Sequence, residues 1–291
     1  MIVIPPIDIL NSATILNSSS IAAGSGSDPA AWNSATNYSL GTRVRVDADK
    51  KIYENIIAGV DATSPGSAPT RWAFVSYMNR YAMFDGVRDN VSTSTSDITL
   101  VFKPGERIDS IAILGISNVT SIRIWVQDLG EVTTYLDQTT TITTEGSLIN
   151  FTLPPIKTPT IKVYINGTGT RTVGEIVLGT HKFIGTVQSN NTLDTLNFSI
   201  VDRDTFGYAN LKTKRSVPKI NCQLLVEAAY VPIVVQARTD LNATPAVWIA
   251  LEDNPVPQYY DPMIILGIYK QFSITFDSSI HATITLELEE I

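Results

Sequence analysis

Residues able to support acid-base, nucleophilic or metal chemistry are few and scattered in this sequence. The two histidines, His181 and His281, lie far apart in different contexts, and no Gly-x-Ser-x-Gly motif marks a serine nucleophile. The single cysteine, Cys222, allows neither an intramolecular disulfide nor a structural zinc site, which needs about four Cys or His ligands. We therefore expect no enzymatic activity, no cofactor and no metal.

Four acidic residues are the best candidates for the carboxylate pair of a glycosidase, namely Asp202, Asp204, Glu252 and Asp253. Segment 202–207 has the composition of a hairpin turn between two strands, and segment 252–255 that of a loop. The turn interpretation is the stronger one for both segments. A polysaccharide depolymerase is accordingly the least supported function.

Composition excludes further classes of function. The net charge of -7 and the isoelectric point near 4.9 disfavour nucleic-acid binding, because phosphate recognition requires clustered Lys and Arg. The only basic run indicates the solvent-facing side of a strand or a subunit contact, and it comprises Lys212, Lys214, Arg215 and Lys219. The first residues contain neither a basic segment nor a long apolar run, so we expect no signal peptide, no membrane span and synthesis in a cytoplasm.

The positioning elements are predicted to be β-strands. Apolar residues alternate with polar ones in three segments, which place Ile98/Leu100/Phe102, Ile122/Ile124/Val126 and Ile161/Val163/Ile165 on one face each. One helix is expected, beginning near Pro232, with Ile233, Ala237 and Leu241 on its buried face, and ending by Pro245. The last strand should place its leucines on one face and Glu287 and Glu289 on the other.

These elements predict an all-β chain with four parts. Residues 1–28 contain Pro5-Pro6 and a Ser/Ala/Gly-rich stretch, and are expected to form an extended N-terminal arm that reaches a neighbouring subunit or links domains. The alternative, which the sequence leaves open, is a loosely ordered terminus. A small domain should follow over residues 29–78, then a β-sandwich, jelly-roll-like, over residues 79–180. Residues 181–291 are expected to form a C-terminal β-rich assembly domain with one short helix.

The small domain resembles the carbohydrate-binding module of bacterial chitinases and cellulases. The resemblance covers about a sixth of the chain and rests on Ala31-Trp32, Tyr38-Ser39-Leu40-Gly41, Val44, Ile52-Tyr53-Glu54, Gly59, Ser64-Pro65 and Trp72. Such modules bind sugars by stacking flat aromatic rings on pyranose rings. The resemblance implies Trp32, Tyr38, Tyr53 and Trp72 as carbohydrate-binding residues. The alternative, which the sequence leaves open, is that all four are core residues of a spacer or docking domain.

Most of the remaining chain resembles a group of bacteriophage tail or virion proteins. The matching segments run in order along the chain: 1–8 (MIVIPPID), 80–85 (RYAMFD), 103–105 (KPG), 111–115 (IAILG), 245–249 (PAVWI) and 266–274 (LGIYKQFSI). The resemblance implies a structural subunit of the tail, in the baseplate, collar or tail tip, that joins the tail tube to fibres. The implied partners are other tail proteins and further copies of this chain, within a virion.

A second function stays open from the sequence, a host-surface adhesin that binds glycan through its aromatic module. Exposed aromatic rings in residues 29–78 would favour this adhesin. Buried rings would favour the architectural role.

Overall fold

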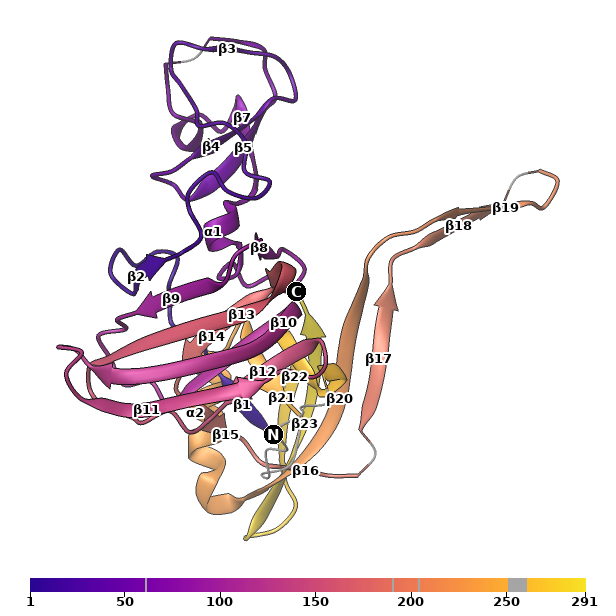
Figure 1. Cartoon of the computed structure of the whole chain (residues 1–291). Coiled ribbons are helices and arrows are strands. Elements are labelled where there is room, and N and C mark those ends of the chain that lie inside the picture. Colours follow the sequence, from indigo (N-terminus) through magenta and orange to yellow (C-terminus); the bar gives the residue numbers. More distant parts are fainter. Residues whose placement is uncertain (61, 190, 204, 251–260) are drawn as a thin grey trace. The chain divides into compact units, whose positions relative to one another are not determined.

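The computed structural model describes residues 1–60, 62–189, 191–203, 205–250 and 261–291 (Figure 1). Strands make up 52% of the described residues and helices 8%, which confirms the predicted all-β class. The chain forms two compact units. The inserted unit is Ile7–Val177, and the terminal unit combines Met1–Pro6 with Leu178–Ile291.

The inserted unit contains an eight-stranded antiparallel sheet with the path β11-β10-β13-β9-β2, and β8, β12 and β14 pair beside this path. Its strands are β2 (Leu16–Ser19), β8 (Ser92–Ser94), β9 (Ile98–Phe102), β10 (Ser110–Asp128), β11 (Thr134–Thr141), β12 (Gly146–Asn150), β13 (Pro159–Val173) and β14 (Glu175–Gly179). Strand β14 crosses from this unit into the terminal unit.

Strand β10 links the two halves of this sheet. Its first part pairs with β12 and its later part with β11 and β13, and register shifts between Ile113 and Ser121 separate the two parts. Such bulges bend a strand and increase its twist, which gives this sheet its β-sandwich character. The three predicted alternating triplets are all buried, so their prediction is confirmed: Ile98, Leu100, Phe102, Ile122, Ile124, Val126, Ile161, Val163 and Ile165.

Residues 29–78 form small sheets with a core of their own. The strands are β3 (Asn37–Tyr38), β4 (Arg43–Val46), β5 (Lys51–Asn55), β6 (Gly59–Val60) and β7 (Trp72–Tyr77), with a 3-10 turn, η1 (Pro65–Ser67). Strands β4, β5 and β7 make one antiparallel sheet, and β3 pairs with β6. A short helix, α1 (Asn79–Ala82), follows.

The terminal unit contains the second eight-stranded sheet, with the path β15-β1-β21-β22-β23-β20-β16 and β17 paired to β20. Its strands are β1 (Ile2–Ile4), β15 (Lys182–Phe183), β16 (Thr186–Val187), β17 (Thr192–Asn197), β20 (Ser216–Glu227), β21 (Ala246–Ile249), β22 (Ile264–Phe276) and β23 (His281–Glu290), and β18 (Ile200–Arg203) pairs with β19 (Ala209–Lys212). The helical segments are η2 (Ala228–Tyr230), α2 (Val231–Asp240) and η3 (Asp261–Met263).

The predicted N-terminal arm is wrong. Residues 2–4 form β1, which pairs with β15 on one side and β21 on the other. Met1, Val3 and Ile4 are buried, because an extended apolar segment gains more from completing a sheet than from remaining in water. The rest of segment 1–28 belongs to the inserted unit, where β2 pairs with β9.

Helix α2 begins close to the predicted residue, but its buried face differs from the prediction. Ala237 and Leu241 are buried as expected, whereas Ile233 is exposed and Val234 is buried in its place. The spacing of four residues used in the prediction drifts around a helix with 3.6 residues per turn. Strand β23 behaves as predicted, since Leu286 and Leu288 are buried while Glu287 and Glu289 are half-buried on the opposite face.

Candidate functional site

Three of the four predicted sugar-binding residues form the core of the small module. Tyr38, Tyr53 and Trp72 are buried with Val44 between them. The rings of Tyr38 and Trp72 meet edge to face at a centroid distance of 5.3 Å. The Tyr38 hydroxyl accepts a hydrogen bond of 2.7 Å from the backbone N–H of Asn33. These three rings stabilise the module by packing, and their faces are covered by protein.

The solvent-facing aromatic surface of the module lies elsewhere. Trp32 is half-buried against the core, and Phe74 on β7 is 53% exposed. The Phe74 ring contacts that of Tyr77 at 5.6 Å, and the Lys51 ammonium lies 5.4 Å and 5.5 Å from the two ring centroids. Phe74 stands opposite Tyr53 in the register, beyond the edge of a core too small to cover it. Alternation from the buried Trp72 would have assigned Phe74 to the core, so sequence reasoning missed it.

A polar cavity of about 580 Å³ lies beside Tyr53, and it is lined by Leu10, Asn11, Ala13, Ala48, Asp49, Lys50, Lys51, Tyr53, Gly66 and Ser67. The Tyr53 hydroxyl donates a 3.0 Å hydrogen bond to Asp49. Burial, followed by this bond, raises the pKa of Tyr53 to about 12. The Lys50 ammonium donates to the carbonyls of Leu10 and Ser12, and burial lowers its pKa. The Tyr53 hydroxyl and the Lys50 ammonium are therefore engaged in hydrogen bonds with residues around the cavity, which stabilise its walls.

The candidate catalytic residues are not brought together where the structure describes them. Asp202 forms an ion pair of 3.0 Å with Lys212 across the β18–β19 hairpin, as the turn interpretation predicts. Asp204, Glu252 and Asp253 lie outside the described residues. His281 opens β23, where it stands opposite Glu227, and His181 follows β14. Within the described residues, no group of three or more His, Cys, Asp or Glu side chains is placed to hold a metal ion.

Sequence reasoning missed one close carboxylate pair, Asp85 and Glu175. Burial raises the pKa of both groups, and the Asp85 charge raises the pKa of Glu175 further, well above its usual value. Glu175 accepts a 3.0 Å hydrogen bond from the backbone N–H of Gly86, and Asp85 accepts from Val87 N–H and the Asn90 side chain. Glu175 ties this loop to β14 and Asp85 bonds within the loop, so the role of both carboxyls is structural.

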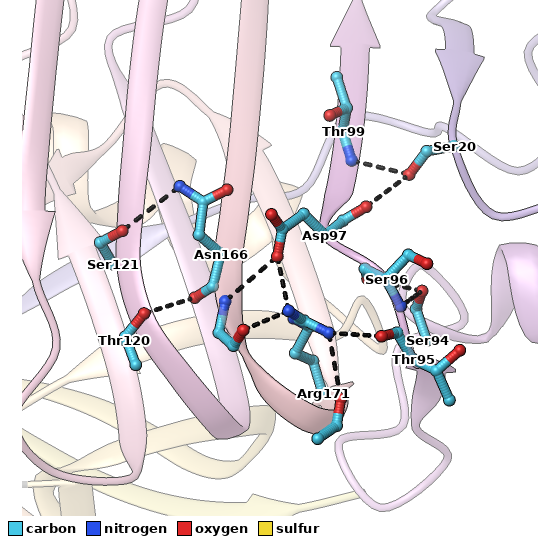
Figure 2. Close-up of polar contacts among 12 residues, drawn as sticks. Ser20, Ser94, Thr95, Ser96, Asp97, Thr99, Thr120, Ser121, Asn166 and Arg171 are labelled. Atoms are coloured by element: carbon cyan, nitrogen blue, oxygen red, sulfur yellow. Dashed lines mark hydrogen bonds and ion pairs between the residues drawn. The ribbon is translucent and has the colours of Figure 1, made fainter.

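Arg171 organises a second polar cluster of the inserted unit, which Figure 2 shows. Its guanidinium donates to the carbonyls of Thr95 at 2.7 Å, Gly169 at 3.0 Å and Gly167, and it pairs with Asp97 at 2.7 Å. The Arg171 side chain is buried, so one cation holds the bulged stretch 166–171 of β13 against segment 94–97. This arrangement fastens the two segments to each other, and the one Arg171 donor without a hydrogen-bond partner among the described residues, Nε, is buried.

A projecting β-arm is the most exposed feature of the terminal unit. We define it as residues 198–215, which contain β18, β19 and their flanking segments, and which extend beyond the sheet as a two-stranded ribbon (Figure 1). Every described residue from 200 to 215 is exposed. Six large apolar side chains are among the exposed residues of the arm: Phe198, Ile200, Val201, Phe206, Tyr208 and Leu211.

Hydrogen bonds hold the arm in its extended form. The β17–β20 ladder ends with Asn197 opposite Ser216, and Phe198 N–H then donates to the Arg215 carbonyl at 3.3 Å. The Ser199 hydroxyl donates to the Lys214 carbonyl and accepts from Lys214 N–H. The ladder thus continues from the body of the terminal unit into β18 and β19. Two sequence signals fall on the arm: segment 202–207 predicts a hairpin turn, and the basic run that begins at Lys212 and includes Lys214, Arg215 and Lys219 indicates a strand face or a subunit contact.

The chain matches no protein-family model, and a search of curated proteins finds no match. Where the structure is described, no helix has both the length and the apolar character needed to cross a lipid bilayer.

Proposed function

We propose that this protein is a non-enzymatic structural subunit of a bacteriophage tail, and that its β-arm attaches it to a neighbouring subunit of the particle. The exposure of the β-arm carries this proposal. A two-stranded ribbon is only marginally stable by itself in water, and six large apolar side chains are exposed within its 198–215 range. Clustered exposed apolar residues of this kind mark surfaces that bind protein.

The burial of the module aromatics supports the architectural role over the adhesin. A sugar-binding platform needs ring faces in contact with solvent, whereas Tyr38, Tyr53 and Trp72 are buried in the module core. The resemblance of several ordered segments to phage tail proteins is the reason for proposing a phage tail as the particle that contains this subunit. In this proposal residues 29–78 act as a spacer or docking domain.

A cryo-EM reconstruction of the phage particle whose genome encodes this chain tests the proposal, because the chain can be traced in it. We expect density for the chain in the tail, with residues 198–215 buried against another subunit. A particle that lacks the chain would refute the structural role. A particle that contains the chain with residues 198–215 in solvent and the Phe74 surface on glycan would favour the adhesin instead.

A further inference from the structure

We infer that the β-arm of one copy binds the body of a second copy of this chain, so that the subunits associate head to tail. This inference rests on the proposed structural role and names the partner of the β-arm. The body here means the terminal unit without residues 198–215.

Apolar surface provides the first part of the argument. Val201 and Leu211 stand opposite each other in the β18–β19 register, on one face of the ribbon, and they are 57% and 70% exposed. Phe206 and Tyr208 at the tip are 86% and 75% exposed. These exposed apolar and aromatic side chains are of the kind expected at the centre of a protein interface, because a few such residues contribute most of the binding energy there.

Charge selects the partner. The β-arm contains four basic and two acidic residues, whereas the body contains four basic and ten acidic residues, so the arm and the body carry opposite net charges. Lys212 is paired with Asp202 within the arm, and Lys214 is an exposed cation beside it. An arm with excess positive charge is attracted to the acidic body of another copy, while two arms repel each other. Charge complementarity therefore favours arm-to-body contact over arm-to-arm contact.

The geometry of such a contact sets the kind of assembly. Each copy donates one arm and accepts one arm through a different surface, which is a heterologous interface. Repetition of this contact closes a ring or extends a filament, and it leaves every interior copy with two neighbours.

Two variants test the inference with the full-length chain. In Val201→Thr/Leu211→Thr the β-branched replacements keep strand propensity while removing apolar surface. The matched control is Leu40→Thr/Val132→Thr, which removes a leucine and a valine of similar exposure, 69% and 85%, from the inserted unit. Analytical ultracentrifugation at concentrations up to about 100 µM, above the dissociation constants of ordinary specific interfaces, should show oligomers of the parent and of the control. The arm variant should associate at least about tenfold more weakly.

A mixing experiment distinguishes head-to-tail from arm-to-arm association. In the acceptor variant, Asn-Gly replaces residues 199–214 and closes a tight hairpin between Phe198 and Arg215, which are already hydrogen bonded. Arg215 is retained because it pairs with Glu290. The tagged acceptor should capture an untagged parent chain, and about 0.5 M salt should weaken capture because surface charges are screened.

The outcomes separate this inference from the proposed function. A parent chain that is monomeric at every concentration, or an acceptor that captures no parent chain, would overturn the self-association. A cryo-EM tail in which the β-arm is buried against a different protein would also overturn it while leaving the structural role intact. Equal weakening in the arm variant and the control would refute the assignment of the contact to Val201 and Leu211.

Discussion

Replacing Arg171 with methionine should strongly destabilise the inserted unit. Methionine keeps most of the apolar stem but removes the guanidinium that reaches three backbone carbonyls and Asp97. Because the Arg171 side chain is buried, the loss includes charged hydrogen bonds that are worth roughly 1.5 to 3 kcal/mol each in favourable settings. Water can replace the donor at the exposed Thr95 and Gly169, which reduces the sum.

The Asp97 partner contributes little to this loss. Its side chain is 54% exposed, and an ion pair with one exposed partner is screened and typically adds about 1 kcal/mol or less. The net cost of Arg171→Met is therefore about 3 kcal/mol, in the range measured when one member of a buried polar network is removed. For a unit of this size, this cost corresponds to a decrease of roughly 1 to 2 M in the urea midpoint.

Urea unfolding followed by tryptophan fluorescence, with the exchange of amide hydrogens measured in segments 94–97 and 166–171, checks this prediction. Arg123 supplies the control, because it forms a bidentate ion pair with Asp137 but on an exposed sheet face, so Arg123→Met should barely move the midpoint. A midpoint for Arg171→Met that coincides with that of Arg123→Met would show that the Arg171 network does not stabilise the unit.

Three further predictions follow from buried groups. Burial and the charge of Asp85 keep the pKa of Glu175 in the folded protein above its ordinary value of 4.5. The protonated Glu175 therefore contributes to stability below pH 4.5, and this contribution is lost as the pH rises through the folded pKa. Glu175→Gln should therefore remove part of the stability loss that the parent shows as the pH rises above 4.5, and parallel pH profiles of urea midpoints for variant and parent would contradict this. Burial raises the pKa of the Cys222 thiol to about 11, so an aromatic disulfide reagent at pH 8 should label it only after unfolding, and rapid labelling of folded protein would be inconsistent with its position. Trp72→Ala should cost about 3 to 5 kcal/mol and make residues 29–78 selectively sensitive to protease, because the module core has few other large side chains, and unchanged cleavage would argue against that core.

Local patterns predicted much of the strand content correctly. The triplet at Ile98, Leu100 and Phe102 was identified because alternation with a period of two reports directly on which face is buried. The hairpin at 200–212 was identified from turn residues, and helix α2 from Pro232 and the following apolar residues. These features depend on neighbours within a few positions along the chain.

Features that depend on distant segments were not predictable in the same way. Met1–Ile4 was taken for an arm because its partners in β15 and β21 lie far along the sequence. The aromatic residues of the module were identified, but Phe74 could be distinguished from Trp72 only by the size of the core beneath them. Arg171 carried no signal, since its partners are mainly backbone carbonyls, which every residue possesses.

The path of the chain through β1 has a consequence for the order of folding. Strand β1 belongs to a sheet whose other strands all follow residue 181, so it must wait while the inserted unit is synthesised. Closing a flexible loop of about 170 residues would cost on the order of 4 to 5 kcal/mol in chain entropy. The Pro5 carbonyl packs so closely on Gly179 that a side chain at 179 would clash, so the segments flanking the insertion run side by side.

An insertion that folds first therefore changes the kinetic problem for the remaining chain. Once residues 7–177 are folded, the long flexible loop between β1 and β15 is replaced by a compact body, and much of the loop entropy has already been lost. A ribosome-bound chain would then contain a folded inserted unit and an unpaired strand β1. One edge of β1 would stay exposed until β21 is translated. We expect arrested chains whose first 180 residues have all emerged from the ribosome to protect the inserted unit from protease while leaving residues 1–6 accessible.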